Sequence, residues 1–283
     1  MGIKLKLHKY NNILVIFNDT HSNSSVIADK IFNDFSKGYN FNKINEFDLE
    51  NYELKSTDLV VTIGGDGTIL RAAHKISGSS IPILGINTGR VGFMSELESN
   101  NFQTQVQNYF NGGARIEYRF MLEAKIKSNN TLHALNDITL ARGKFLRVIE
   151  ISTEINGVHL ATYRGDGVVA SSPTGSTAYS LSLGSPVLDP TSNNILLKPI
   201  ATHMSQFGGV VLGSNSKIKL TVFTQNDAIL NIDGFMDIEM GNTDSVEVKI
   251  SNRKVGFLRM KSPDEYWGNL SRKLGIRKGT YKI

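Results

Sequence analysis

The sequence predicts an α/β domain built on a parallel sheet, followed by a mostly-β domain and a final helix. Over roughly the first hundred residues, near-continuous apolar segments alternate with amphipathic ones. After Gly112-Gly113 apolar residues recur at every second position, and glycine-rich runs follow several of the apolar segments. A chain of 283 residues, of which 40% are hydrophobic and 20% charged, is long enough for roughly two such domains.

The first domain is expected to alternate strands with helices. Continuous apolar runs predict strands at Asn12 to Phe17, Leu59 to Ile63 and Ile81 to Asn87. Apolar residues at helical spacing predict a helix over Ser24 to Phe35, and a second helix through Leu70, Ala73 and Ile76. Strands that are apolar throughout are buried on both faces, which indicates a Rossmann-like parallel sheet with ligands at the carboxyl ends of its strands.

The second domain is expected to be a β-sandwich. Arg147 to Ile155 and Val158 to Tyr163 alternate at period two, and the Asn156-Gly157 pair between them is a strong hairpin signal. Further alternating strands are expected at 217–223, 228–232 and 245–250. The tail from Phe257 onward predicts a final helix, with apolar residues at Tyr266, Trp267, Leu270 and Leu274. We expect this helix to return to the first domain, which gives domains at 1–114, completed by 257–283, and at 115–256.

The charge and composition restrict the partners. The net charge of +5 and the pI near 9.2 come from basic residues scattered among acidic ones, which suits a small anionic ligand better than nucleic acid. The densest basic stretch, Arg272 to Lys282, is short and terminal. There are no cysteines and no apolar run near the roughly 18 residues that span a bilayer, so we expect a cytoplasmic protein that does not bind membranes.

The first candidate site is the run Gly64-Gly65-Asp66-Gly67-Thr68, which leaves a predicted strand and enters a predicted helix. Glycines tolerate positive φ and let a ligand approach the backbone, and a helix N-terminus attracts phosphate. A carboxylate would repel phosphate, so Asp66 is a candidate proton acceptor or metal contact. An ordinary tight turn with Asp66 or Thr68 as helix cap fits the same residues. The run lacks the lysine of G-x-x-x-x-G-K-[ST] and the spacing of G-x-G-x-x-G.

A second candidate site is the run from Gly165 through Tyr179, which holds more glycines and hydroxyls than a turn needs. Such residues can bind ribose or amide groups, and Tyr179 can stack on a flat ring, although a structural loop before a helix at 176–183 would use the same residues. Asn136-Asp137 lies between the two glycine runs, where an ordinary strand end is the simpler explanation.

In combination, these three motifs resemble the ATP-dependent NAD kinases, which phosphorylate the 2′-hydroxyl of the adenosine ribose of NAD. The first run matches the glycine-aspartate loop of that family, Asn136-Asp137 matches its Asn-Glu/Asp pair, and Gly165 through Tyr179 matches its second glycine-rich signature. The resemblance runs from about Leu59 to Ile276. The first motif alone is shared with lipid kinases and phosphofructokinases, whereas all three in this order are specific.

The resemblance implies a role for each matching residue. Asp66 is the expected base that activates the ribose hydroxyl, and Asn136 and Asp137 are expected to hold the ribose. The ATP phosphates are expected at Gly64, Gly65, Gly67, Thr68 and Arg71. The other residues expected to contact NAD, beside Gly67, are Phe93, Arg164, Asp166, Thr174, Thr177, Ala178, Tyr179 and His203. Arg164 resembles the polar residue of relatives that prefer NAD to NADH.

The same resemblance implies the cofactor and the assembly. Mg²⁺ or another divalent metal is expected to arrive with ATP, and no protein side chain is expected to hold it. A homodimer or homotetramer is expected because in this family residues from different subunits share the NAD site. Polyphosphate as donor stays open, as does the use of NADH.

Two other functions stay open at this point. A lipid kinase would use the same first loop, but the second glycine run would have no purpose and the chain shows no basic amphipathic membrane helix. A dinucleotide sensor without activity would need no base at Asp66.

Overall fold

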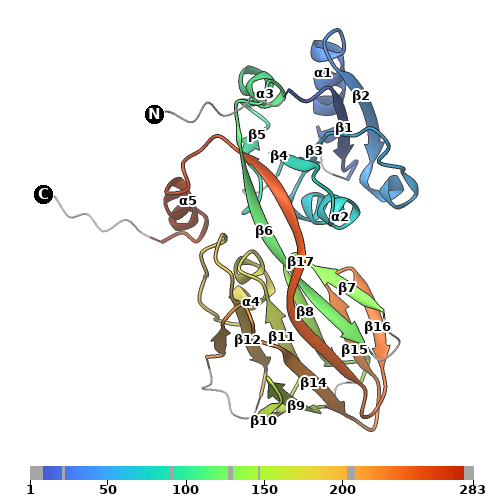
Figure 1. The fold of residues 1–283 in the computed structure, drawn as a ribbon, viewed down its shortest axis with the longest axis vertical. Helices are drawn as coiled ribbons and strands as arrows, with labels where there is room; N and C mark the ends of the chain where they lie inside the picture. Colours follow the sequence, from blue (N-terminus) through green and yellow to red (C-terminus); the bar gives the residue numbers. More distant parts are fainter. Residues whose placement is uncertain are drawn as a thin grey trace, which may run out of the picture. The chain divides into compact units, whose positions relative to one another are not determined.

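A computed structural model of the chain describes residues 9–20, 23–89, 92–126, 130–145, 147–202 and 208–276. The described residues form two compact units, one within 1–117 together with 255–283 and the other within 118–254 (Figure 1). The chain passes from one unit to the other within two strands, β6 (Arg115–Ile126) and β17 (Ser245–Arg259). None of the described helices is long and apolar enough to cross a bilayer.

The first unit is an α/β domain with a parallel sheet, as predicted. Its strands lie in the order β2-β1-β3-β4, β4 pairs with the end of β17, and every one of these pairs is parallel. The strands are β1 (Asn12–Phe17), β2 (Asn40–Asn45), β3 (Leu59–Gly64), β4 (Pro82–Asn87) and the short β5 (Leu97–Glu98). The helices are α1 (Ser24–Phe35), the 3₁₀ helix η1 (Glu46–Asn51), α2 (Asp66–Ile76), α3 (Phe102–Phe110) and α5 (Glu265–Lys273).

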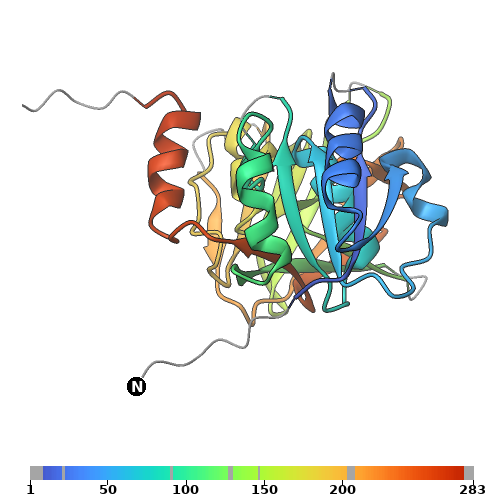
Figure 2. The same cartoon turned by 90° about the horizontal axis from the view of Figure 1, so that it is seen from above.

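Helices cover both faces of this sheet, which explains why its central strands are apolar throughout. Alternate residues of β1 and β3, such as Ile13 and Val61, share a buried cluster with Ile31 of α1 and Val106 of α3. Figure 2 shows α1 and α3 on the same side of the strands. Gly85 of β4 faces α2 on the other side, since a Cβ there would lie 2.8 Å from Cδ1 of Ile69.

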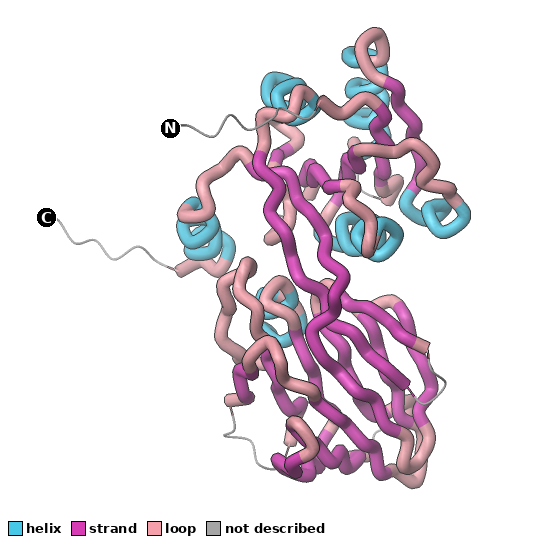
Figure 3. Tube along the Cα trace, viewed as in Figure 1, coloured by secondary structure: helices cyan, strands magenta, loops and turns pink. Residues whose placement is uncertain are grey.

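The second unit is a sandwich of two antiparallel sheets, also as predicted. One sheet has the order β10-β9-β14-β17, and the other has the order β13-β12-β11-β8-β15-β16. Alternate residues from both sheets form one buried cluster, for example Ile151 and Leu220 from the first with Leu140 and Val168 from the second. Among the described residues of this unit, strands (magenta in Figure 3) far outnumber helices.

The elements of the second unit have the following bounds. The strands are β7 (Thr131–Ala134), β8 (Asp137–Arg142), β9 (Ile149–Ile155), β10 (Val158–Gly165), β11 (Gly167–Ser171), β12 (Ile195–Ile200), β13 (Val210–Leu212), β14 (Ile218–Phe223), β15 (Ala228–Ile232) and β16 (Met236–Met240). The 3₁₀ helix η2 (Gly175–Thr177) and the short α4 (Tyr179–Ser182) follow β11. Asn156 and Gly157 both have positive φ, 53° and 82°, so the predicted hairpin turn between β9 and β10 is confirmed.

The C-terminal segment differs from the prediction in one respect. The strand expected to end at Ile250 continues to Arg259, and the helix begins only at Glu265. Phe257 and Leu258 are both fully buried because this end of β17 pairs with β4 and is covered on both faces. Two consecutive buried residues fit helical spacing as well as a covered strand, and only the pairing with β4 distinguishes the two.

Candidate functional site

The first predicted motif lies at the carboxyl end of β3, where the chain enters α2. Gly65 is the N-cap of α2 in extended conformation, with φ −96° and ψ −172°, and Asp66 is the first helical residue. Of the two properties of glycine that the motif offers, positive φ is not used, because no glycine of this loop has it. The glycines provide space instead: a Cβ on Gly64 would lie 2.3 Å from Oγ1 of Thr68, and the space beside Gly67 is open for at least 4 Å.

The carboxylate of Asp66 turns away from its own helix. It accepts hydrogen bonds from the backbone N–H of Phe93, at 2.7 Å, and of Met94, at 3.2 Å. The alternative that Asp66 or Thr68 caps the helix is therefore wrong, since no side chain caps α2. A Cβ on Gly92 would lie 2.2 Å from the Asp66 carboxylate, so this position must be glycine for the contact to form.

Segment 92–94 is held in turn by the C-terminal part of the chain. Arg259 donates a hydrogen bond of 2.8 Å to the Met94 carbonyl and pairs with Glu96 and Glu117 in a buried cluster. The ammonium group of Lys273, the last residue of α5, donates to the Gly92 carbonyl and lies 4.6 Å from the ring centroid of Phe93. The sequence reasoning missed both cations because each lies far along the chain from the motif that it supports.

Two residues predicted for the ATP phosphates have other surroundings. The hydroxyl of Thr68 is buried and has no hydrogen-bond partner among the described residues. Any phosphate contact of Thr68 would therefore use its backbone N–H. The guanidinium of Arg71 lies 3.6 Å from the carboxylate of Glu46 and 5.5 Å from the ring of Phe47.

Asn136 and Asp137 stand at the start of β8, in the second unit. β8 lies between β11 and β15 in antiparallel register, which brings the end of each neighbour beside this start. Asp233, directly after β15 and with φ 52°, accepts hydrogen bonds from three consecutive N–H groups. Its carboxylate lies 2.6 Å from the nitrogen of Leu135, 2.7 Å from that of Asn136 and 2.8 Å from that of Asp137. The sequence reasoning did not single out Asp233, although its position in Ile232-Asp233-Gly234 after a strand was a usable signal.

The side chain of Asp137 has an unusual protonation equilibrium. Burial, followed by the nearby charge of Asp233, raises the pKa of Asp137 from 3.8 to about 7, and the Thr139 hydroxyl opposes this shift. The Thr139 hydroxyl lies 3.3 Å from the carboxylate. Near neutral pH this carboxyl group can therefore either donate or accept a hydrogen bond.

The glycine-hydroxyl run packs directly against Asn136. A Cβ on Gly175 would lie 2.1 Å from the Asn136 carbonyl oxygen, and the N–H of Ser172 donates to that same oxygen at 2.8 Å. The hydroxyls of Ser176 and Ser180 donate to backbone carbonyls within the loop, and the Ser172 hydroxyl donates to the carbonyl of Leu135 beside Asn136. These three serines therefore serve the structure of the loop.

The remaining predicted residues of the run divide by exposure. The Thr174 side chain is buried and Thr177 donates to the Thr174 carbonyl, whereas Tyr179 is 44% exposed. The pKa of Tyr179 is raised by burial and then by the charges of Asp137 and Asp166. Tyr179, Asp137 and Asp166 therefore belong to one electrostatic cluster, with Ala178 beside Tyr179 in the chain.

Asp166 and Arg164 lie in different surroundings. Asp166 follows β10 and accepts a hydrogen bond of 2.7 Å from Arg142, which the sequence reasoning missed. Arg164 is exposed near Glu150, at 3.9 Å. It lines an open hollow of about 700 Å³ together with residues such as Arg147 and Asn242, and the described lining of this hollow includes none of the other predicted residues. His203 lies outside the described residues.

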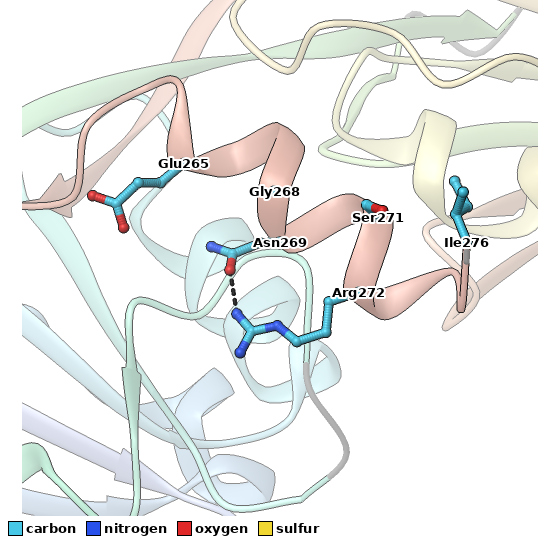
Figure 4. A pocket seen from close by; sticks show the side chains of 6 residues that line it. All are labelled: Glu265, Gly268, Asn269, Ser271, Arg272 and Ile276. Carbon is cyan, nitrogen blue, oxygen red and sulfur yellow. Dashed lines mark hydrogen bonds between the residues drawn. The ribbon is translucent and has the colours of Figure 1, made fainter. Parts of the chain in front are cut away.

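A second open hollow, of about 550 Å³, runs along α5 (Figure 4). Its described lining consists of Glu265, Gly268, Asn269, Ser271, Arg272 and Ile276, which includes none of the predicted site residues.

Comparison with known proteins matches both units to one family. Residues 14–114 match the family described as ATP-NAD kinase N-terminal domain, and residues 135–260 match the ATP-NAD kinase C-terminal domain. An NAD kinase of Dehalococcoides mccartyi is 38% identical over 227 residues, which cover 78% of this chain and 80% of that protein. An NAD kinase of Clostridium botulinum is 34% identical over 274 residues, which cover 94% of this chain and 97% of that protein.

Solved structures agree in fold. The crystal structure of an NAD kinase from Archaeoglobus fulgidus in complex with ATP is 25% identical, with a TM-score of 0.77, over 94% of this chain and 100% of that chain. The crystal structure of yeast NADH kinase complexed with NADH has a TM-score of 0.85 at 23% identity, over 98% of this chain and 91% of that chain, and shows the shared fold. With both domains matched in order and these identities over most of its length, the chain belongs to the NAD kinase family.

Proposed function

We propose that this protein transfers the γ-phosphoryl group of ATP to the 2′-hydroxyl of the adenosine ribose of NAD, giving NADP and ADP. In this reaction the 2′-oxygen forms a bond to the γ-phosphorus, and the bond from that phosphorus to the β–γ bridging oxygen breaks. The proton of the hydroxyl goes to the carboxylate of Asp66. Membership of the NAD kinase family supports this reaction, and the arrangement around Asp66 supports its mechanism.

The observation that carries the mechanism is the position of Asp66 at the first residue of α2, beside the open space at Gly67. The N–H groups of a first helical turn have no partner within the helix and attract phosphate. A carboxylate accepts about four hydrogen bonds, and Asp66 uses two of these positions for Phe93 and Met94. About two positions stay available for the proton of a substrate hydroxyl, which is a poor nucleophile without a base.

The divalent metal is proposed to enter with ATP. Among the described residues, no group of three or more His, Asp or Glu side chains is arranged to hold a metal ion. Mg²⁺ binds mainly through substrate phosphates and water, so we expect the nucleotide to carry the metal. When bound, the metal neutralises phosphate charge. Gly64, Gly65 and Gly67 are proposed to leave room for the phosphates.

The second unit is proposed to hold NAD. Asn136 and Asp137 would bind the ribose hydroxyls, since Asp233 fixes their backbone and the carboxyl group of Asp137 can donate or accept near neutral pH. Thr174, Thr177, Ala178 and Tyr179 would line the adenine site with Phe93. Tyr179 is the one aromatic residue of the run, and it is exposed. Asp166 would bind near the nicotinamide end, with Arg142 holding its carboxylate, and Arg164 and His203 keep their predicted contacts.

The test is a phosphate-transfer assay with purified protein, MgATP and either NAD, NADH, diacylglycerol or sphingosine. We expect NAD to gain phosphate, and a dehydrogenase that accepts only the 2′-phosphorylated dinucleotide to use the product. Replacing ATP by polyphosphate in a parallel reaction identifies the donor. Phosphate transfer to a lipid alone, or no transfer to any acceptor, would overturn the proposal.

Two further expectations accompany this function. The protein is proposed to act in the cytoplasm and as a homodimer or homotetramer. Light scattering coupled to size-exclusion chromatography measures the assembly, and a monomer that is fully active at assay concentration would contradict it.

A further inference from the structure

The last residue of α5 points toward the candidate base. The Lys273 ammonium donates to the Gly92 carbonyl and lies 4.6 Å from the ring centroid of Phe93, in the segment whose N–H groups bind Asp66. Lys273 and Asp66 also attract each other electrostatically. The short segment 92–94 therefore binds the candidate base through two of its N–H groups and the lysine through one of its carbonyl groups.

The surroundings of this lysine make its charge costly. The pKa of Lys273 is lowered to about 8 by burial first, and Arg259, Lys261 and Arg272 lower it further, while Asp66 opposes them. A surface lysine ordinarily extends its ammonium group into water. A partly buried lysine with a shifted pKa beside a candidate base is typical of functional sites, where such perturbed groups concentrate.

The phosphate loop itself has no basic side chain. In G-x-x-x-x-G-K-[ST] loops a lysine reaches the β- and γ-phosphates, and the run 64–68 lacks it. Arg71, the nearest basic residue of α2, lies at Glu46 and Phe47 instead. Arg259 is bound to Glu96, Glu117 and the Met94 carbonyl. Lys261 donates to the backbone carbonyl of Glu96, whereas the Lys273 ammonium group lies at Gly92 and is attracted by the charge of Asp66.

We propose that Lys273 replaces the missing loop lysine, and that its ammonium group contacts a γ-phosphoryl oxygen of ATP beside Asp66 during transfer. This inference rests on the proposed function. The ammonium group would exchange its bond to the Gly92 carbonyl for the phosphate, or share its three protons between them. A fixed positive charge at this place stabilises the negative charge that the phosphoryl group carries in the transition state.

The competing explanation is that Lys273 only fastens α5 to segment 92–94. Three variants separate the two explanations. Lys273→Met keeps the apolar stem without the charge, and Lys273→Arg keeps the charge and can still stack on Phe93. Arg272→Gln is the matched control, because it removes a positive charge from the neighbouring position. The Arg272 side chain bonds to Asn269 of its own helix (Figure 4).

For each variant, kcat and KM for ATP, the Kd of NAD and of ATP, and the melting temperature are measured. For Lys273→Met we expect kcat/KM for ATP to fall by roughly 10²- to 10³-fold, the size of a lost charge contact to a transition state. The Kd of NAD should change less than threefold, and the melting temperature by only a few degrees. Lys273→Arg should recover most of the activity, and Arg272→Gln should stay within threefold of the unmodified protein.

A pH series provides a readout that a fastening role would not change. The unmodified protein should lose kcat/KM for ATP above about pH 8, by up to tenfold per pH unit, as Lys273 loses its proton. In the Lys273→Arg variant, kcat/KM for ATP should stay constant to higher pH, because arginine keeps its charge. Asp66, Arg259, Lys261 and Arg272 surround the ammonium in both proteins, so the difference between the two profiles belongs to position 273.

The inference is overturned if Lys273→Met keeps kcat/KM for ATP within threefold. It is also overturned if Lys273→Met and Lys273→Arg both lose activity, and if both lose NAD affinity and stability to the same extent. If the unmodified protein transfers no phosphate to NAD, the proposed function fails. The direct ATP Kd of Lys273→Met against Arg272→Gln then still decides whether Lys273 contacts the nucleotide.

Discussion

Each of the two units uses an aspartate to hold a distant segment by its backbone. The two carboxylates differ in the number of backbone N–H groups that they bind. Asp66 accepts from Phe93 and Met94, while Asp233 accepts from three consecutive N–H groups beginning at Leu135. A carboxylate accepts about four hydrogen bonds, so about two positions of Asp66 stay available. Asp66 can therefore hold its loop and still take a proton, whereas Asp233 serves to position its neighbours.

The charged neighbours differ in the same way. Asp66 faces the ammonium of Lys273, and Asp137 faces the carboxylate of Asp233. A like charge favours the neutral form of an acid. The second unit therefore suits a carboxyl group that can be neutral when it binds a sugar hydroxyl.

The largest expected effect is the loss of kcat when Asp66, the proposed base, is replaced. Phe93 and Met94 donate to different oxygens of Asp66, so the Asp66→Asn variant keeps an acceptor for one of these N–H groups and cannot take a proton. We expect kcat to fall by roughly 10²- to 10⁴-fold, the usual contribution of general base catalysis, with the Kd of NAD nearly unchanged. Steady-state kinetics and calorimetric NAD binding measure this. Unchanged kcat would remove Asp66 as the base.

The second prediction concerns Asp137 and the pH dependence of the free energy of unfolding. Its folded pKa is raised to about 7, so its stabilising contribution is complete below pH 3.8 and is lost as the pH rises to about 7. Asp137→Asn does not titrate, so the variant should gain free energy of unfolding relative to the unmodified protein across this range, by up to about 1.4 kcal/mol per pH unit.

Denaturant unfolding of both proteins between pH 4.5 and pH 8.5 measures this difference. Thr139→Val, which removes the hydroxyl near Asp137 but keeps the carboxyl group, is the control that should keep the pH dependence. A constant difference between the Asn variant and the unmodified protein at all pH values would contradict the prediction.

The smallest expected effect compares two glycines. In Gly175→Ala the new methyl would lie 2.1 Å from the Asn136 carbonyl oxygen, so we expect a loss of about 1–3 kcal/mol in the free energy of unfolding. In Gly67→Ala the methyl meets open space within a helix, and stability should stay equal or rise by up to about 1 kcal/mol. Its KM for ATP should nevertheless rise, because the methyl would occupy the proposed phosphate space. Denaturant unfolding and kinetics test both, and equal stability losses would contradict the contrast.

The sequence predicted most elements because their signals are local. The bounds of β1 and α1 agree with the runs of β-branched residues and with the helical spacing from which they were predicted. The end of β17 was missed because Phe257 and Leu258 become a strand only through their pairing with β4. The sequence left open whether the glycines at Gly64 provide space or positive φ, because glycine composition alone does not distinguish a need for space from a need for unusual backbone angles.

By itself, the sequence determined the fold class, the three motifs and the family that they resemble, because periodicity and spacing are properties of neighbouring residues. Only the tertiary structure decided which groups surround the motifs. Gly92, Arg259 and Lys273 act around Asp66, and Asp233 acts on Asn136 and Asp137, through contacts between segments far apart in the chain. Hydrogen bonds and charges act over a few ångströms in space, and sequence spacing does not record which distant residues the packing of strands and helices brings that close.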